Sequence, residues 1–211
     1  FAKDSESRAS VGIQTLSRQP VSYQFMPRGS AFVSSAGGVP GIRLPADTVE
    51  GLRPFVQVQG AVADLVTFLR KFDWMMAVLA DPAACRRIAR ENVEDARREG
   101  IDYLELRFSP VFMARTHGLD PARVVEAVAE GVAEGSRQTG VRVKLIGILS
   151  RTFGPESCRK ELDALLTQRD RLVALDLAGD EKNWPAELFR EHFRRGREAG
   201  WAVTVHAGEA G

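Results

Sequence analysis

Two ionisable side chains near the end of the sequence have the types and spacing of a catalytic pair. His206 follows the β-branched run at residues 203–205 (VTV), and Glu209 comes three residues later across an alanine and a glycine. These small residues permit a tight turn, so the imidazole and the carboxyl group can face the same space. A neutral imidazole is a good zinc ligand, and a semi-buried carboxyl group can donate a proton. An H-x-x-E pair alone is more often a strand-end histidine beside a solvated glutamate, so its surroundings must decide.

Two further sets of residues could line a pocket. Residues 176–181 (DLAGDE) hold three acids and Gly179, and a glycine permits close backbone approach to a planar ligand. Phe68 and Phe72 lie on one side of a helical pattern. Taken locally, the first set is more typical of an exposed turn, and the second of a packed core.

The remaining cysteines and histidines are predicted to have no role in a site. Cys85 and Cys158 lie far apart, without the spacing of a zinc knuckle or a redox pair, and we expect both to be buried packing residues. His117 and His192 stand among polar residues, and we expect them to be solvated.

The elements that must position these residues alternate along the chain. Hydrophobic periodicity, caps and breakers predict helices over about 48–52, 61–80, 82–100, 120–140, 155–168 and 185–200, and strands over 101–108, 141–149, 172–177 and 201–205. Strand starts about 30 to 40 residues apart are typical of βα units around a parallel sheet, either doubly wound or a barrel.

The position of the chemistry favours the barrel. Candidate residues follow the strands at Ser109, Ser150, Gly179-Asp180 and His206, and (β/α) barrels build their sites at the carboxyl ends of their strands. No G-x-G-x-x-G follows a strand, which argues against dinucleotide binding.

Composition predicts an ordinary globular protein with one domain. The chain has 211 residues, 29 basic and 28 acidic side chains and a net charge of +1. This balance gives no reason to expect a nucleic acid, a membrane surface or a polyanion as partner. No apolar run reaches the roughly 18 residues that span a bilayer, and two thiols do not make a disulfide framework, so we expect a cytoplasmic protein. Residues 1–44 hold eight serines and no apolar period, and we expect them to be loop-like or disordered.

Five segments together resemble bacterial adenosine deaminase. They are FLRKFDW (68–74), YLELRFSP (103–110), KLIGILSRTFG (144–154), ALDLAGDE (174–181) and AGWAVTVHAGEAG (199–211). The resemblance runs from about Leu44 to Gly211 and implies an α/β fold, the TIM-type (β/α)8 barrel, with one catalytic zinc ion. It also implies that a zinc-bound water attacks C6 of adenosine or deoxyadenosine, so that ammonia leaves and inosine or deoxyinosine forms.

The same resemblance implies a role for each candidate residue. His206 matches the third histidine ligand of the zinc, and Glu209 matches the acid that protonates purine N1. Gly179 matches the residue whose backbone N–H binds purine N3, and Phe68 and Phe72 match an apolar lid over the substrate. The implied partner is a small purine nucleoside. The match at RFSP and LSRTFG favours adenosine over adenine.

The sequence departs from the family pattern in its metal ligands. Residues 1–44 contain no histidine, so the H-x-H pair of the family's first strand is absent. A later histidine and an aspartate pair of the family are absent too. We therefore expect about strands two to five of eight over residues 45–211, with one of four metal ligands. Residues 1–44 would be a frameshifted or mis-started segment, or else a divergent extension.

Two functional hypotheses remain open from the sequence. The first is an incomplete copy of a zinc adenosine deaminase, inactive by itself. The second is a non-catalytic module that keeps a deaminase-derived half barrel for nucleoside binding or assembly.

Overall fold

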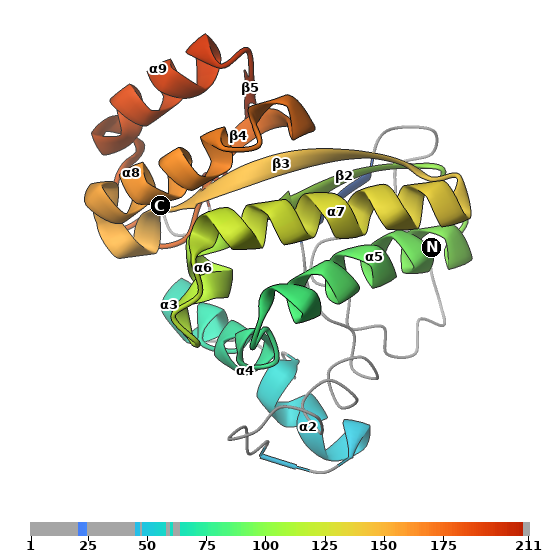
Figure 1. Cartoon of the computed structure of the whole chain (residues 1–211). Helices are drawn as coiled ribbons and strands as arrows, with labels where there is room; N and C mark the ends of the chain where they lie inside the picture. The colour runs from blue at the N-terminus through green and yellow to red at the C-terminus, as the bar shows by residue number, and fades with distance from the viewer. Residues whose placement is uncertain (1–20, 25–44, 47, 58–59, 61–63, 209–211) are drawn as a thin grey trace, which may run out of the picture.

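A single parallel sheet runs through the molecule. The computed structural model describes residues 21–24, 45–46, 48–57, 60 and 64–208 (Figure 1). The strands are β1 (Val21–Gln24), β2 (Tyr103–Phe108), β3 (Arg142–Ser150), β4 (Leu172–Ala178) and β5 (Ala202–Val203). All neighbours pair in parallel, in the order β1-β2-β3-β4-β5. Because a doubly wound sheet reverses its strand order partway, this unbroken order supports the barrel type.

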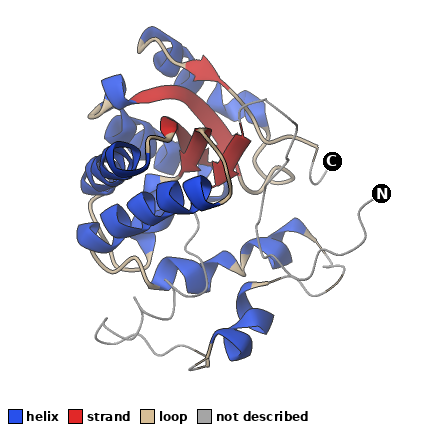
Figure 2. Ribbon diagram, turned by 90° about the vertical axis from the view of Figure 1, so that its right-hand side faces the viewer, coloured by secondary structure: helices blue, strands red, loops and turns tan. Residues whose placement is uncertain are grey.

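Helices connect the strands. Those between residues 82 and 198 lie along one side of the sheet, whereas those between residues 49 and 77 lie beyond it (Figures 1 and 2). They are α2 (Val49–Val56), α3 (Leu65–Leu69), α4 (Phe72–Ala77), α5 (Pro82–Arg98), α6 (Pro110–Arg115), α7 (Pro121–Thr139), α8 (Gly154–Leu166) and α9 (Arg190–Glu198). Short 3-10 turns, η1 (Arg151–Phe153), η2 (Arg169–Arg171) and η3 (Ala186–Phe189), lie between them. None of the helices in the described part of the chain is long and apolar enough to cross a membrane.

Alternation along the strands decides which side chains meet these helices. In β2, Leu104, Leu106 and Phe108 are buried, while the residues between them are partly exposed. In β4, Leu175 packs against Gly196 of α9. Since successive strand residues point to opposite faces, the residues between these apolar positions face away from the helices. That second face carries the polar chemistry.

Cap signals set the helix ends as the sequence predicts. Asp81 and Asp120 accept hydrogen bonds from the backbone N–H groups of Ala84 and Ala122, and a proline follows each cap. Helix α7 ends at Gly140, whose φ of 77° is left-handed. The cysteines are confirmed as buried packing residues, because Cys85 and Cys158 are both free and fully buried.

Several predicted elements differ from the observed ones. The helix predicted over 61–80 breaks into α3 and α4, with a turn at residues 70–71. Helix α6 was not predicted, and β5 is shorter than the predicted strand at 201–205. Apolar periodicity marks the buried side of a segment but does not locate such breaks, which depend on the contacts that each turn makes.

The expectation for residues 1–44 differs from the structure at residues 21–24. These residues form β1, which pairs in parallel with Leu104 to Arg107 of β2. A four-residue strand is too short to show a period, and pairing with β2 satisfies its backbone groups. The other residues of this segment lie outside the described part of the chain, and the domain boundary at residues 44 and 45 stays a prediction.

The prediction of a solvated histidine is wrong for His192, which is buried, while His117 is partly exposed. His117 Nε2 lies 2.7 Å from the carbonyl oxygen of Ala77, and His192 Nε2 lies 2.9 Å from that of Pro155. His192 is 7% exposed. Each ring bonds to a carbonyl far away in the sequence, so local polarity gave no signal of its contact.

Candidate active site

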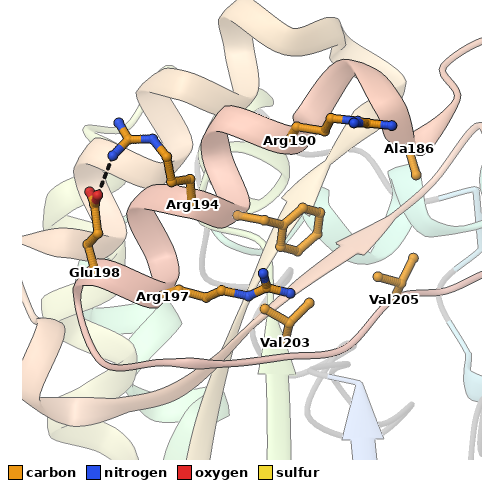
Figure 3. A pocket seen from close by; sticks show the side chains of 8 residues that line it. Ala186, Arg190, Arg194, Arg197, Glu198, Val203 and Val205 are labelled. Atoms are coloured by element: carbon orange, nitrogen blue, oxygen red, sulfur yellow. Dashed lines mark hydrogen bonds and ion pairs between the residues drawn. The ribbon is translucent and has the colours of Figure 1, made fainter.

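His206 stands on the sheet face that points away from the helices. Val203 pairs with Leu175, which packs on α9, and Val203 and Val205 both line a hollow beside that helix (Figure 3). Alternation therefore turns Thr204 and His206 toward the opposite face. Asp176, next to Leu175 in β4, points to that same face.

A buried carboxylate holds the ring of His206. Asp176 is fully buried, and its Oδ2 lies 2.9 Å from His206 Nδ1. The same oxygen accepts a hydrogen bond from Arg107 Nη1 at 3.0 Å, while Oδ1 accepts one from the backbone N–H of Leu177 at 2.9 Å. The carboxylate thus links the side chains of three strand ends, β2, β4 and β5.

The backbone of His206 is held as well. Its N–H donates to the carbonyl oxygen of Leu177 at 2.9 Å, and its own carbonyl accepts from Arg151 Nη2 at 2.7 Å. Arg151 is only 1% exposed. Two residues later, the N–H of Gly208 donates to Glu181 Oε1 at 2.9 Å. Ring and main chain are therefore fixed together, as precise placement of a ligand side chain requires.

Gly179 allows the turn after β4 to come close to the turn after β3. Its φ is 108°, and a Cβ at this position would overlap the Thr152 hydroxyl. That hydroxyl oxygen accepts a hydrogen bond from the N–H of Asp180 at 3.0 Å. Only glycine fits both the dihedral angle and the contact.

Ser109 and Ser150, which the sequence places at strand ends, meet at Glu161 of α8. Glu161 accepts hydrogen bonds from Ser109 Oγ at 2.6 Å and from the N–H of Val111 at 3.0 Å, and its other oxygen accepts from the N–H of Ser150 at 2.6 Å. Glu161 is 1% exposed, and burial, which outweighs these hydrogen bonds, raises its pKa to about 7. This carboxyl group accepts three hydrogen bonds from residues that follow two strands, and we therefore assign it a structural role.

The two phenylalanines of the predicted lid contact each other. Phe68 and Phe72 pack edge to face with ring centroids 5.2 Å apart. Phe72 is 3% exposed and belongs to the core, whereas Phe68 is partly buried against it. Their role over a substrate stays a prediction.

His206 is the predicted zinc ligand that lies among the described residues, and its Nδ1 is 2.9 Å from Asp176 Oδ2. Its role as a metal ligand stays a prediction. A zinc site needs about four ligands, and among residues 64–208 and the shorter described stretches no three His, Cys, Asp or Glu side chains are grouped to hold a metal. Glu209, the predicted proton donor, lies outside the described residues.

A hollow of about 690 Å³ lies on the other face of β5, between this strand and α9 (Figure 3). Arg190, Arg194 and Arg197 surround its apolar floor, with Val203 and Val205 at one side. Arg194 forms an ion pair with Glu198. His206 faces away from this hollow. The hollow is therefore not the cavity into which this side chain would point.

Arg107, Arg151 and Glu161 are the site residues that sequence reasoning missed. Arg107 had a usable signal, since it alternates with the apolar residues of β2 and must face the second side of the sheet. Arg151 follows β3 directly and had the same strand-end position as the predicted candidates. Glu161 sits mid-helix among charged residues, where no local pattern distinguishes it from a solvated one.

A parallel sheet whose strands follow one another in sequence order, with helices between them, is the arrangement of a (β/α) barrel. The chain belongs to the adenosine deaminase family, whose model matches residues 30–211. This match begins earlier than the resemblance at Leu44.

Curated relatives agree with this assignment. The adenosine deaminase of Edwardsiella ictaluri is 62% identical over 169 residues, which are 80% of this chain and 51% of that protein. The adenosine deaminase of Pectobacterium atrosepticum is 59% identical over 169 residues, or 80% of this chain and 50% of that one. The chain thus spans about half the length of the curated relatives it matches.

Solved structures agree on the fold. An adenine deaminase from Arthrobacter aurescens superimposes with a TM-score of 0.78 at 26% identity, covering 91% of this chain and 58% of that one. An amidohydrolase from Burkholderia ambifaria with bound zinc gives a TM-score of 0.71 at 25% identity, covering 90% and 52%. The partial-barrel prediction is confirmed.

Proposed function

We propose that this chain forms part of a zinc-dependent deaminase that converts adenosine or deoxyadenosine and water to inosine or deoxyinosine and ammonia. The observation that carries the proposal is the ring of His206, which Asp176 holds through Nδ1 at 2.9 Å at the carboxyl end of the sheet. The identity of 62% and 59% to two proteins named adenosine deaminase supports adenosine over adenine as substrate.

In the complete enzyme, zinc supplies a bound water that ionises near neutral pH. We assign metal binding and proton transfer to residues of this chain. His206 provides one metal ligand, and Glu209 gives a proton to purine N1, which makes C6 more electrophilic. A glutamic acid can hold that proton at neutral pH when a partly buried site raises its pKa.

The substrate is oriented by backbone and apolar contacts. The N–H of Gly179 donates to purine N3, which needs the close approach that the left-handed turn at this residue provides. Phe68 and Phe72 cover the base and exclude water. In the reaction the C6–N bond breaks, a C6–O bond forms, and the amino group leaves as ammonia.

The experiment compares the 211-residue chain with the product of the complete coding region around it. We expect the longer product to bind one zinc ion and to form inosine, measured by the absorbance change of adenosine. The 211-residue chain should do neither, because the described residues provide one ligand. Glu209→Gln in the longer product should lower kcat by about a hundredfold or more, as loss of a general acid does.

Two results would contradict the proposal. A longer product that folds and binds no zinc would remove the metal chemistry. Binding of adenosine by the 211-residue chain without zinc, together with no turnover by the longer product, would support the non-catalytic nucleoside-binding module instead.

A further inference from the structure

The carbonyl group of His206 accepts a hydrogen bond from a side chain at a point where a regular sheet would supply a backbone N–H. The N–H of His206 donates to the carbonyl oxygen of Leu177 at 2.9 Å, so the pairing with β4 still runs in register here. In a parallel ladder, a residue that donates to one residue of the neighbouring strand accepts from the residue two places further on. The expected donor to the His206 carbonyl is therefore the N–H of Gly179.

Arg151 takes the place of that backbone donor. Its Nη2 donates to the His206 carbonyl oxygen at 2.7 Å. In the part of the chain that the structure describes, the N–H of Gly179 does not donate to this oxygen. One guanidinium hydrogen bond thus stands where the ladder would have its next N–H···O bond.

The local structure explains the exchange. Gly179 leaves the line of β4 one residue after that strand ends, with a φ of 108°. A Cβ at this position would overlap the Thr152 hydroxyl and lie 3.2 Å from the Thr152 backbone nitrogen, so the turn after β3 packs directly against Gly179. Arg151 is the first residue of that turn. It is therefore placed where it can reach the acceptor that Gly179 does not use.

A long side chain is needed to make this contact from β3. The strands stand in the order β3-β4-β5, so Arg151 and His206 follow strands that are two places apart. Neighbouring strands lie about 4.8 Å apart, which puts roughly 10 Å between the two chains. Arginine crosses such a distance and ends in a planar fork of N–H donors. Arg151 is 1% exposed, so it acts through the residues that it holds and not by touching a substrate.

We propose that Arg151 is a positioning residue whose guanidinium replaces the N–H of Gly179 as donor to the His206 carbonyl, which keeps His206 in line with the sheet and leaves the N–H of Gly179 for a ligand. The hydrogen bond of Arg151 is a property of this chain by itself. The identity of the ligand rests on the proposed function, in which purine N3 accepts from the N–H of Gly179. One side chain thus places a candidate metal ligand and a substrate-binding N–H together.

The hydrogen bond can be measured on the 211-residue chain, because His206 is the one histidine that precedes an alanine. Labelling with [1-¹³C]histidine and [¹⁵N]alanine therefore gives a single carbonyl–amide correlation, from His206 and Ala207. Arg151→Met removes the charged donor, and a neutral N–H in its place would bond more weakly. We expect the ¹³C signal of the His206 carbonyl to move upfield in this variant. An unchanged signal would overturn the proposal.

Arg159→Met is the matched control for this substitution. Arg159 pairs with Glu156 on the surface of α8, with its side chain 61% exposed. The same replacement at this position removes a guanidinium without reaching the turn after β3. The carbonyl signal of His206 should stay where it is in the unmodified chain.

The other two histidines report whether each variant folds. His117 precedes a glycine and His192 precedes a phenylalanine, so the corresponding pairs of labels give one signal for each carbonyl. Both signals should stay in place in Arg151→Met. If they move as well, Arg151→Lys provides the second case, because lysine keeps the buried cation but has a shorter reach and a single nitrogen. The His206 signal should then move alone, and a signal that matches the unmodified chain would overturn the proposal.

The role of Gly179 is tested on the longer product with inosine and 3-deazainosine as competitive inhibitors. The second compound has a C–H group in place of purine N3 and is otherwise the same. One neutral hydrogen bond should make inosine bind about fivefold more tightly. In Arg151→Met the His206 carbonyl competes for the N–H of Gly179, so this ratio should fall toward one. Arg159→Met should keep the ratio.

The ratio separates positioning from a purely structural role, because a weakened fold alone would not change the preference between two inhibitors. Equal binding of both by the unmodified enzyme, or a ratio that Arg151→Met leaves unchanged, would overturn the proposal. The kcat for adenosine should also fall by about a hundredfold in Arg151→Met, as a displacement of about 1 Å in an active site can cause. An inactive longer product beside a responsive His206 signal would contradict only the proposed function. An active one beside an unresponsive signal would contradict only this inference.

Discussion

Two buried carboxyl groups lie at the carboxyl ends of the strands, and their surroundings differ in kind. Glu161 extends from a helix and receives one hydroxyl and two backbone N–H donors, all neutral. Asp176 belongs to a strand, receives hydrogen bonds from a guanidinium and a backbone N–H, and lies 2.9 Å from an imidazole nitrogen. The first joins residues at two strand ends, whereas the second pairs with the side chain of Arg107 and lies beside His206. Two equally buried carboxyl groups thus differ in the charge of the groups that surround them.

The difference also concerns charge. The three groups that donate to Glu161 are all uncharged, and burial raises its pKa to about 7. Asp176 is equally buried and forms an ion pair with Arg107, whose side chain is 19% exposed. Loss of one partner of a buried ion pair leaves the other charge uncompensated. We therefore expect loss of the cation beside Asp176 to destabilise the fold, and loss of the ionisable group at Glu161 to remove a pH dependence of stability.

Arg107→Met should have the largest effect, because it leaves Asp176 buried without its cation. The free energy of unfolding should fall by about 3–5 kcal/mol at neutral pH, the usual cost of breaking a buried pair from one side. Urea denaturation followed by circular dichroism measures it. Arg123→Met is the control, since Arg123 pairs with Glu126 on the surface with side chains 64% and 42% exposed. The control should change stability by less than about 0.5 kcal/mol. Equal losses in the two variants would show that the ion pair at Asp176 stabilises the fold no more than a surface ion pair does.

Glu161→Gln should change how stability depends on pH. The folded pKa of Glu161, about 7, lies above its ordinary value of 4.5. Between these values the folded state binds more protons, so the free energy of unfolding falls as pH rises, by up to about 3 kcal/mol in total. This contribution is complete below pH 4.5 and is lost as pH passes 7.

The glutamine variant does not titrate at this position and should lose that slope. Denaturation of the unmodified chain and the variant at about pH 5 and about pH 8 measures the difference, which follows from the same linkage relation. Glu156→Gln is the control, because Glu156 lies on the same helix with its side chain 67% exposed. Parallel pH curves for the unmodified chain and Glu161→Gln would contradict the prediction.

The sequence predicted which residues share a face better than it predicted which residues touch. In 172–178 (LVALDLA) one acid stands among apolar residues, and alternation alone places Asp176 opposite Leu175. Its partner Arg107 is 69 residues away. That contact follows from the register of β2, β3 and β4, which backbone pairing sets and which no local pattern encodes. Glu161 was beyond reach for a similar reason, since its burial depends on how α8 turns toward two strand ends.

Gly179→Ala should disturb the turn after β4 without touching either carboxylate. The alanine would have to keep a φ of 108° and would displace the Thr152 hydroxyl that accepts from Asp180. We expect the free energy of unfolding to fall by about 2 kcal/mol. This loss is smaller than those expected at Arg107 and Glu161 and larger than that of a surface substitution. Gly118→Ala is the control, with a φ of 63° and open space around its Cβ. It should cost about 1 kcal/mol, the cost of the dihedral angle alone. If the control costs as much as Gly179→Ala, the contact with Thr152 contributes nothing.

Val205→Thr should have the smallest effect and separates the two faces of β5. Val205 is 40% exposed and lines the hollow beside α9, whereas His206, the next residue, is held on the other face. Threonine keeps the β-branched shape and has comparable strand preference, so stability should change by less than about 0.5 kcal/mol. The NMR signals of the His206 ring should also persist, because Asp176 lies near the ring on the face that Val205 does not reach. Changed ring signals in this variant would show that the hollow and the histidine are coupled through the strand, and the distinction between the faces would then fail.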